Sequence, residues 1–150
     1  MSAEVVALIR RADLLIHRFG RWPDFADAEL VTLRLDRGDL LSAFRTGDYA
    51  AAVHPSATVV FRLADNRFPV GAPDRKETLA TLRFERLDAV SIRGFNHQNP
   101  ILGLGITRRW LRRLRMEMFD VRWGGTAMGH DVRLTCGSIE VAEVCDFAGL

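Results

Sequence analysis

The sequence predicts a single α+β domain in which an N-terminal helix packs on a mostly antiparallel sheet of seven or eight strands. A chain of 150 residues has the usual size of one domain, and its 48% hydrophobic residues can supply one core. A helical period occurs near the N-terminus, and short alternating segments separated by turn residues follow it. Helices and strands do not alternate, which disfavours a parallel sheet, and no repeat or linker divides residues 1–150.

Residues 3–19 carry the helical period. Apolar side chains recur there in steps of three and four, which gives a helix one face for burial. Ser2 can cap the start of this helix, and Gly20 can end it in the left-handed conformation. Asp13 is a point at which the segment can divide into two shorter helices. We expect the apolar face to pack on the sheet.

The expected strands share an alternation of apolar and polar side chains. Gly103 and Gly105 suggest bends, so the sheet is free to curve strongly. Proline and glycine residues make 66–76 a loop, and residues 40–44 are a candidate for a further short strand. The main strands are expected at residues 29–36, 57–63, 78–86, 89–95, 101–107, 114–121, 132–136 and 139–144, with tight turns at 87–88 and 137–138.

Composition excludes several classes of protein. No apolar run reaches the roughly 18–20 residues that cross a bilayer, and the N-terminus lacks the basic region of a signal peptide. We therefore expect a cytoplasmic protein that does not bind membranes. Cys136 and Cys145 match no metal-binding or redox spacing. Because both lie in predicted strands, we expect buried free thiols.

Three carboxylates lie at the entry to the first predicted strand. Asp27 and Glu29 are two residues apart, so on an extended chain they project to the same face. Paired carboxylates can bind a divalent metal ion or share acid–base chemistry. The simpler interpretation is that Asp24 caps a turn and the other two acids are solvated. Spacing alone favours this simpler interpretation.

The most informative segment of the sequence is Phe95 to Asn99. Its polar residues Asn96, His97, Gln98 and Asn99 offer many hydrogen-bond donors and acceptors without formal charge. Such a run can order its own backbone in a turn, or it can form a recognition surface. No serine or cysteine is an evident partner for His97, so no catalytic triad is indicated. Residue type alone favours the structural role.

Residues 108–115 place five arginines around Trp110. This segment can be a solvated hairpin tip, a protein interface or a contact for nucleic acid. Without these five charges, the formal net charge of +2 becomes about −3, so the rest of the chain has no broad basic field. Nucleic acid is therefore the least favoured of the three interpretations.

Three segments together resemble the immunity protein 50 family. Residues 19–29 are similar to its opening motif, residues 81–85 with 94–99 to its central strand and most distinctive segment, and residues 132–141 to its last strand pair. The resemblance spans most of residues 19–144, with 40–73 poorly covered. The matching motif residues are Trp22, Pro23, Phe25, Asp27, Glu29, Phe95, Asn96, His97, Gln98 and Asn99.

The resemblance implies a bacterial immunity protein, which protects the producing cell by binding and neutralising a cognate toxin encoded next to it. It also implies a small α+β fold and no catalytic activity, and we expect neither a metal nor a cofactor. One departure is visible, because the family's histidine before Asp-Ala-Glu is Ala26 here. That departure favours a structural or contact role for Asp27 and Glu29 over a metal-binding role.

Three hypotheses follow for the binding residues. As a toxin-binding protein, the chain would use anchors among Trp22, Asp27, Glu29, His97, Arg109, Trp110 and Arg112, although Trp22 and Phe95 can instead be core residues. The alternative is a small-ligand or metal-binding domain in which Asp27, Glu29 and His97 converge on one site. Binding of nucleic acid through residues 108–115 is a third, weaker hypothesis.

Overall fold

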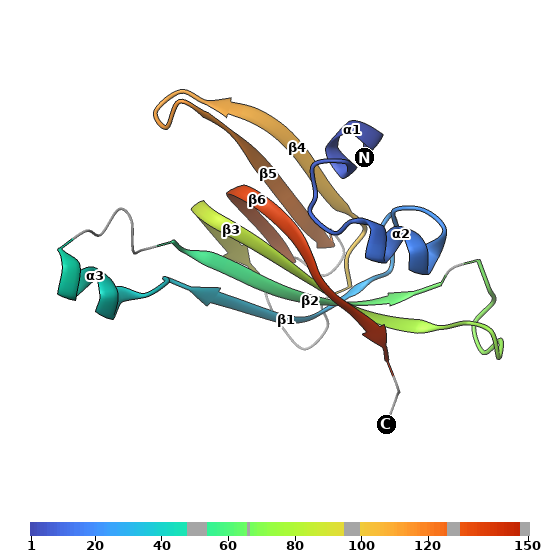
Figure 1. Ribbon diagram of the computed structural model, residues 1–150. Helices are drawn as coiled ribbons and strands as arrows, with labels where there is room; N and C mark the ends of the chain where they lie inside the picture. Colours follow the sequence, from blue (N-terminus) through green and yellow to red (C-terminus); the bar gives the residue numbers. More distant parts are fainter. Residues whose placement is uncertain (48–53, 66, 95–99, 126–129, 148–150) are drawn as a thin grey trace.

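The computed structural model describes residues 1–47, 54–65, 67–94, 100–125 and 130–147, which form three short helices and one sheet of six strands. The elements are α1 (Ala3–Val6), α2 (Asp13–Phe19), β1 (Glu29–Asp36), α3 (Leu40–Thr46), β2 (Ser56–Ala64), β3 (Glu77–Arg93), β4 (Leu104–Leu111), β5 (Met116–Gly125) and β6 (His130–Asp146). The strand order is β1-β2-β3-β6-β5-β4, and every neighbouring pair is antiparallel (Figure 1). The mostly antiparallel sheet is therefore confirmed.

The described sheet has six strands rather than seven or eight, because two predicted turns lie inside long strands. β3 and β6 each run for 17 residues and pair with each other along their length. At 87–88 the ladder shifts in register instead of reversing, and just before it Arg86 takes a φ of 54°. Gly137 lies against this residue, where an added Cβ would be 2.8 Å from Nε of Arg86. Segments 87–88 and 137–138 therefore bend the two strands.

β2 and β5 each pair with only part of a long strand, which divides the sheet into two halves. β2 pairs with residues 77–85 of β3, and β5 pairs with residues 130–136 of β6. The ring of Phe61 on β2 nevertheless lies 5.5 Å from the ring of Trp123 on β5. In a flat sheet, the two intervening strands would separate these positions by about 14 Å. The sheet is therefore strongly curved, and its halves face each other.

An aromatic cluster fills the inside of this curve. The ring of Phe61 also lies 5.4 Å from that of Phe25, and Trp123 stacks on Phe84 with ring centroids 6.0 Å apart. All four side chains are buried, and α2 contributes further apolar side chains to the same core. Such tilted and offset ring pairs are favourable beyond the apolar area that they bury. The cluster joins both halves of the sheet to the loop before β1.

The segment expected as an N-terminal helix forms two helices, α1 and α2, and α2 begins at Asp13, the point at which the sequence allowed a division. Between them, Arg10 forms an isolated strand-like bridge with β6. Ser2 caps α1, and Gly20 ends α2 with a φ of 74°. Between the helices, the N–H of Arg10 donates to the carbonyl of Ile139, and the N–H of Val141 donates to the carbonyl of Arg10, each at 2.9 Å. Here β6 has no β5 partner, so Arg10 occupies its free edge. α2 contacts β6 and α1 contacts β4.

Residues 40–46 form a helix, so the predicted short strand at 40–44 is wrong. The side chain of Asp39 accepts the N–H of Ser42 at 2.9 Å, which satisfies a free donor of the first turn. Gly47 ends the helix with a φ of 71°. The apolar run at 40–44 is too short to distinguish the period of a helix from the alternation of a strand. The capping residues at its two ends favour the helix.

A short segment before β4 connects the two ends of the curved sheet. The N–H of Asp27 donates to the carbonyl of Ile101 at 3.0 Å, and the N–H of Ile101 donates to the carbonyl of Ala28 at 2.8 Å. The N–H of Leu102 donates to the carbonyl of Gly124 at 3.0 Å. The strand order stays open, but the start of β1 and the end of β5 are tied together.

Replacing Trp123 by alanine is expected to lower the free energy of unfolding by about 3–5 kcal/mol, because it empties the centre of the aromatic cluster. Trp110 is 59% exposed and supplies the matched control. Trp110→Ala should change stability by less than about 0.5 kcal/mol. Urea unfolding followed by far-UV circular dichroism measures both values. Equal effects of the two substitutions would contradict the packing described here.

Candidate functional site

The first motif segment is chiefly structural. Phe25 is buried, and the ring of Trp22 lies 5.8 Å from it with its own side chain half-buried. Phe25 also has a left-handed backbone, with a φ of 60°. The pair connects the chain after α2 to the aromatic cluster. Trp22 is therefore a packing residue, with part of its surface open to solvent.

Asp27 and Glu29 are not placed as an extended chain would place them. Asp27 is exposed, but its φ of 61° turns the backbone before β1 begins. Nε of Arg62 lies 3.6 Å from a carboxylate oxygen of Glu29. The expectation that both acids share one face because the chain is extended is therefore wrong. Among the described residues, no three histidine, cysteine, aspartate or glutamate side chains gather in a way that could hold a metal ion.

Phe95, Asn96, His97, Gln98 and Asn99 lie outside the described residues. Their predicted roles, including the convergence of His97 with the two acids, stay predictions. The flanks of the segment are described. β3 ends just before it, and the residue that directly follows it forms an antiparallel bridge with the first residue of β1. The structure therefore brings Pro100, the residue after this motif, beside Glu29, the last residue of the first motif.

The predicted residues of 108–115 lie on the hairpin of β4 and β5. Arg109 and Trp110 are consecutive on β4, so their side chains leave opposite faces of the strand. Nε of Arg109 lies 2.8 Å from a carboxylate oxygen of Asp120. Arg112 is exposed in the turn, and no ion pair between described residues involves it. The structure thus keeps these three residues in one region, although they do not share one surface.

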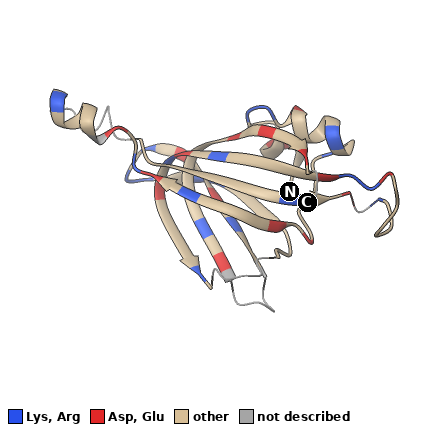
Figure 2. Cartoon of the chain, turned by 90° about the horizontal axis from the view of Figure 1, so that it is seen from below, with Lys and Arg blue, Asp and Glu red and all other residues tan. Residues whose placement is uncertain are grey.

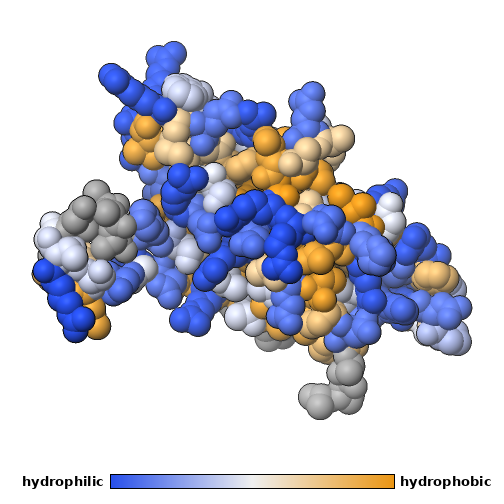
Figure 3. Space-filling model, viewed as in Figure 1, coloured by the Kyte–Doolittle hydropathy of each residue, from blue (hydrophilic) through white to orange (hydrophobic). Residues whose placement is uncertain are grey.

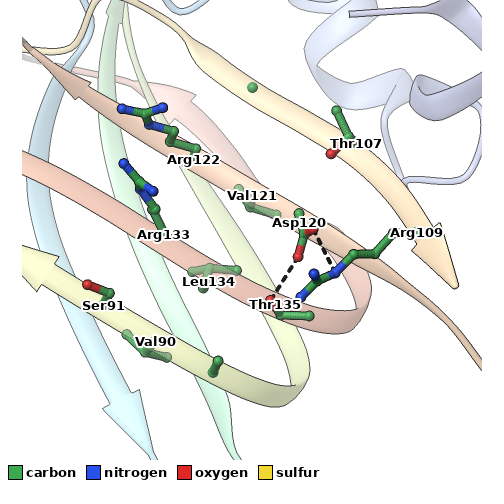
Figure 4. Close-up of a pocket in the computed structure, with 12 residues that line it drawn as sticks. Val90, Ser91, Thr107, Arg109, Asp120, Val121, Arg122, Arg133, Leu134 and Thr135 are labelled. Carbon is green, nitrogen blue, oxygen red and sulfur yellow. Dashed lines mark hydrogen bonds and ion pairs between the residues drawn. The ribbon is translucent and has the colours of Figure 1, made fainter. Parts of the chain in front are cut away.

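Sequence reasoning missed a hollow of about 600 Å³ on the outer face of β3, β6, β5 and β4 (Figure 4). Arg109, Arg122 and Arg133 stand around it on three neighbouring strands. The hollow exists because short side chains around these arginines leave a depression in the surface of the sheet. These short residues are Ala89, Ser91, Gly105, Thr107 and Thr135.

Two aspartates hold the arginines of this hollow. Asp131 accepts hydrogen bonds from Nε of Arg122 at 3.0 Å and from Nε of Arg133 at 2.8 Å. Burial raises the pKa of Asp131, but the hydrogen bonds from both arginines outweigh burial and lower it below its ordinary value. Asp120 accepts the hydroxyl of Thr135 at 2.8 Å. Asp131 therefore stays ionised at neutral pH and fixes both of its arginines by charge.

The two cysteines differ in exposure, which corrects the prediction that both are buried. Cys136 is buried, and burial followed by the nearby charge of Asp120 raises the pKa of its thiol to about 12. Cys145 is exposed near the end of β6. Since the thiolate is the nucleophile, Cys136 is held in an unreactive form at neutral pH.

Comparisons with protein-family models, with curated proteins and with solved structures find no match for this chain. No helix in the described part of the chain has the length and apolar character that crossing a membrane requires.

We expect one equivalent of a thiol reagent such as Ellman's reagent to react quickly with the native protein at neutral pH, and a second to react only after unfolding. The first equivalent is Cys145 and the second is Cys136. Absorbance of the released thiolate measures both phases. Cys145→Ser should remove the fast phase, whereas Cys136→Ser should retain it. Two fast equivalents in the native protein would contradict the burial of Cys136.

Proposed function

We propose that this chain is an immunity protein that binds a toxin in the cytoplasm of the producing cell and neutralises it as a stoichiometric inhibitor. The proposal begins from the resemblance of the motif segments to the immunity protein 50 family. The structural observation that supports it best is the free end of the β4–β5 hairpin. The toxin is expected to be encoded next to this chain. Inhibition of this kind works by occupying the toxin, so it needs no cofactor and no catalytic step.

The end of the hairpin extends beyond its neighbour in the sheet. β5 pairs with β6 from Phe119 onward, so residues 116–118 pair with β4 alone. The hairpin end lies at the upper left of Figure 1. Trp110 and Leu114 of the hairpin are 59% and 42% exposed. Tryptophan and arginine carry a disproportionate share of the energy in protein–protein interfaces. A projecting end that exposes both residue types therefore suits contact with another protein.

The arginines of the hairpin are interleaved with acids, which favours a protein partner over nucleic acid. Arg108 pairs with Glu117, and Arg113 pairs with Asp88. Figure 2 shows basic and acidic residues mixed along the strands. Nucleic acid binding depends on neutralising many phosphates, and nearby carboxylates oppose it. A protein surface, in contrast, can offer a matching pattern of both charges.

Hydrophilic residues cover most of the view in Figure 3, with hydrophobic residues exposed between them. An interface on such a surface would rely on a few anchors surrounded by polar contacts. Trp110 and Arg112 are the strongest anchor candidates, because the first exposes a large apolar side chain and the second is exposed in the turn. Because Trp110 and Arg109 leave opposite faces of β4, a partner that uses both would enclose the hairpin end.

Co-expression with the product of the adjacent gene should give a one-to-one complex and should rescue growth if that product is toxic. Trp110→Ala and Arg112→Ala should each weaken the complex at least tenfold, which is about 1.4 kcal/mol. Isothermal titration calorimetry measures the affinities. Arg34→Ala is the control, since Arg34 is exposed on β1 and pairs only with Asp36 among the described residues. A neighbouring gene without a toxin-like product, no complex and no rescue would refute the proposal.

A further inference from the structure

The three arginines around the hollow are held in the same way. Nε of Arg122 and Nε of Arg133 donate to opposite oxygens of Asp131, and Nε of Arg109 lies 2.8 Å from Asp120. Each aspartate therefore holds its arginine at the base of the guanidinium group. An arginine used only for a structural ion pair commonly presents two nitrogens to its carboxylate, as a parallel fork.

The outer nitrogens of these guanidinium groups remain available. No hydrogen bond to another described residue engages the terminal nitrogens of Arg109, Arg122 or Arg133. The side chains are 52%, 64% and 58% exposed. A guanidinium group has five N–H donors, so four remain on each of these arginines. The hollow is thus surrounded by donors that have fixed positions and no acceptor within the described chain.

Charge in the hollow favours an anion. Three guanidinium groups meet two carboxylates, which leaves one net positive charge. Arg122 and Arg133 are directly opposite each other on β5 and β6, a position in which like charges repel. Asp131 compensates this repulsion from one side only. A second carboxylate on the solvent side would accept from the outer nitrogens and complete the neutralisation.

The form of the hollow favours a segment of protein over a small molecule. Small-ligand pockets bury most of the ligand surface. This hollow lies on an open sheet face, and its arginines are more than half exposed. Arg109 lines the hollow and directly precedes Trp110, whose side chain leaves the opposite face of β4, so a partner that encloses the hairpin end covers both faces. A partner seated on the hairpin can therefore reach the hollow with neighbouring residues.

We propose that the hollow receives a carboxylate-rich segment of the partner protein, with its acidic side chains bound by the outer guanidinium nitrogens of Arg122, Arg133 and Arg109. This inference rests on the proposed function and names the chemistry of the partner's contact. The small residues on the floor, among them Ala89 and Ser91, leave room for the incoming side chains. Bidentate arginine–carboxylate contacts give such a segment a defined orientation.

Fluorescence anisotropy with labelled octaglutamate tests the chemistry directly. We expect saturable binding to the wild-type protein, and at least tenfold weaker binding to the double variant R122Q/R133Q. The control R34Q/R37Q removes the same two charges from exposed arginines outside the hollow, and it should change binding less than twofold. Amide shifts in a ¹⁵N spectrum should gather at Ser91, Thr107 and Thr135. Unchanged circular dichroism would show that the variants are folded.

Four results would overturn the inference. Equal loss in both double variants would mean that octaglutamate senses only net charge. If a single-stranded oligonucleotide binds more strongly than octaglutamate and shifts the same amide signals, the hollow is a site for nucleic acid. If inorganic phosphate binds saturably and displaces octaglutamate, the hollow is a site for small anions. No binding of octaglutamate at low ionic strength would also refute it.

The product of the adjacent gene separates this inference from the proposed function. If wild type and R122Q/R133Q bind that product equally well, the hollow is not the contact, and the proposed function stands. If wild type does not bind it, the proposed function fails. In that case, the binding of octaglutamate to wild type and to the two double variants still tests whether the hollow prefers carboxylates, because this measurement does not involve the product of the adjacent gene.

Discussion

The contact between Phe61 and Trp123 depends on the bends of β3 and β6, and most of the remaining structure depends on that contact. Two strands separate these residues in the sheet, yet their rings lie 5.5 Å apart. The bend requires a left-handed residue at Arg86 and a glycine at 137, because any Cβ there would collide with the arginine side chain. Without the bend, a sheet of this length would need a separate layer to cover its apolar face.

The same bend explains why the N-terminal residues are divided into two helices. Once β5 turns away with the second half of the sheet, the later residues of β6 lose their partner on that side. An unpaired edge next to the core carries free backbone donors and acceptors, which are costly to bury. Arg10 supplies one donor and one acceptor there. A continuous helix would have kept both groups inside its own hydrogen bonds.

Local pattern predicted the elements whose character is decided within a few residues. Residues 29–36 and 57–63 alternate cleanly, and the structure has β1 at Glu29–Asp36 and β2 at Ser56–Ala64. Residues 87–88 and 137–138 have the composition of turns, and only the packing of Arg86 over Gly137 makes them bends. The hollow could not be predicted from the sequence for a similar reason. Arg122 and Arg133 are ordinary outward positions in their own strands, and the strand register makes them neighbours.

The arginines of β4 also bear on how a partner can bind. β4 is one end of the described sheet, so part of its backbone has no strand partner among the described residues. Such an edge invites pairing with another chain, and long charged side chains are a common protection against it. Arg108 and Arg109 project from both faces of β4 near the hairpin end. Adding a strand to β4 would have to order the side chains of Arg108 and Arg109. Contact through Trp110 and the guanidinium groups needs no such rearrangement. This arrangement favours recognition by side chains over extension of the sheet.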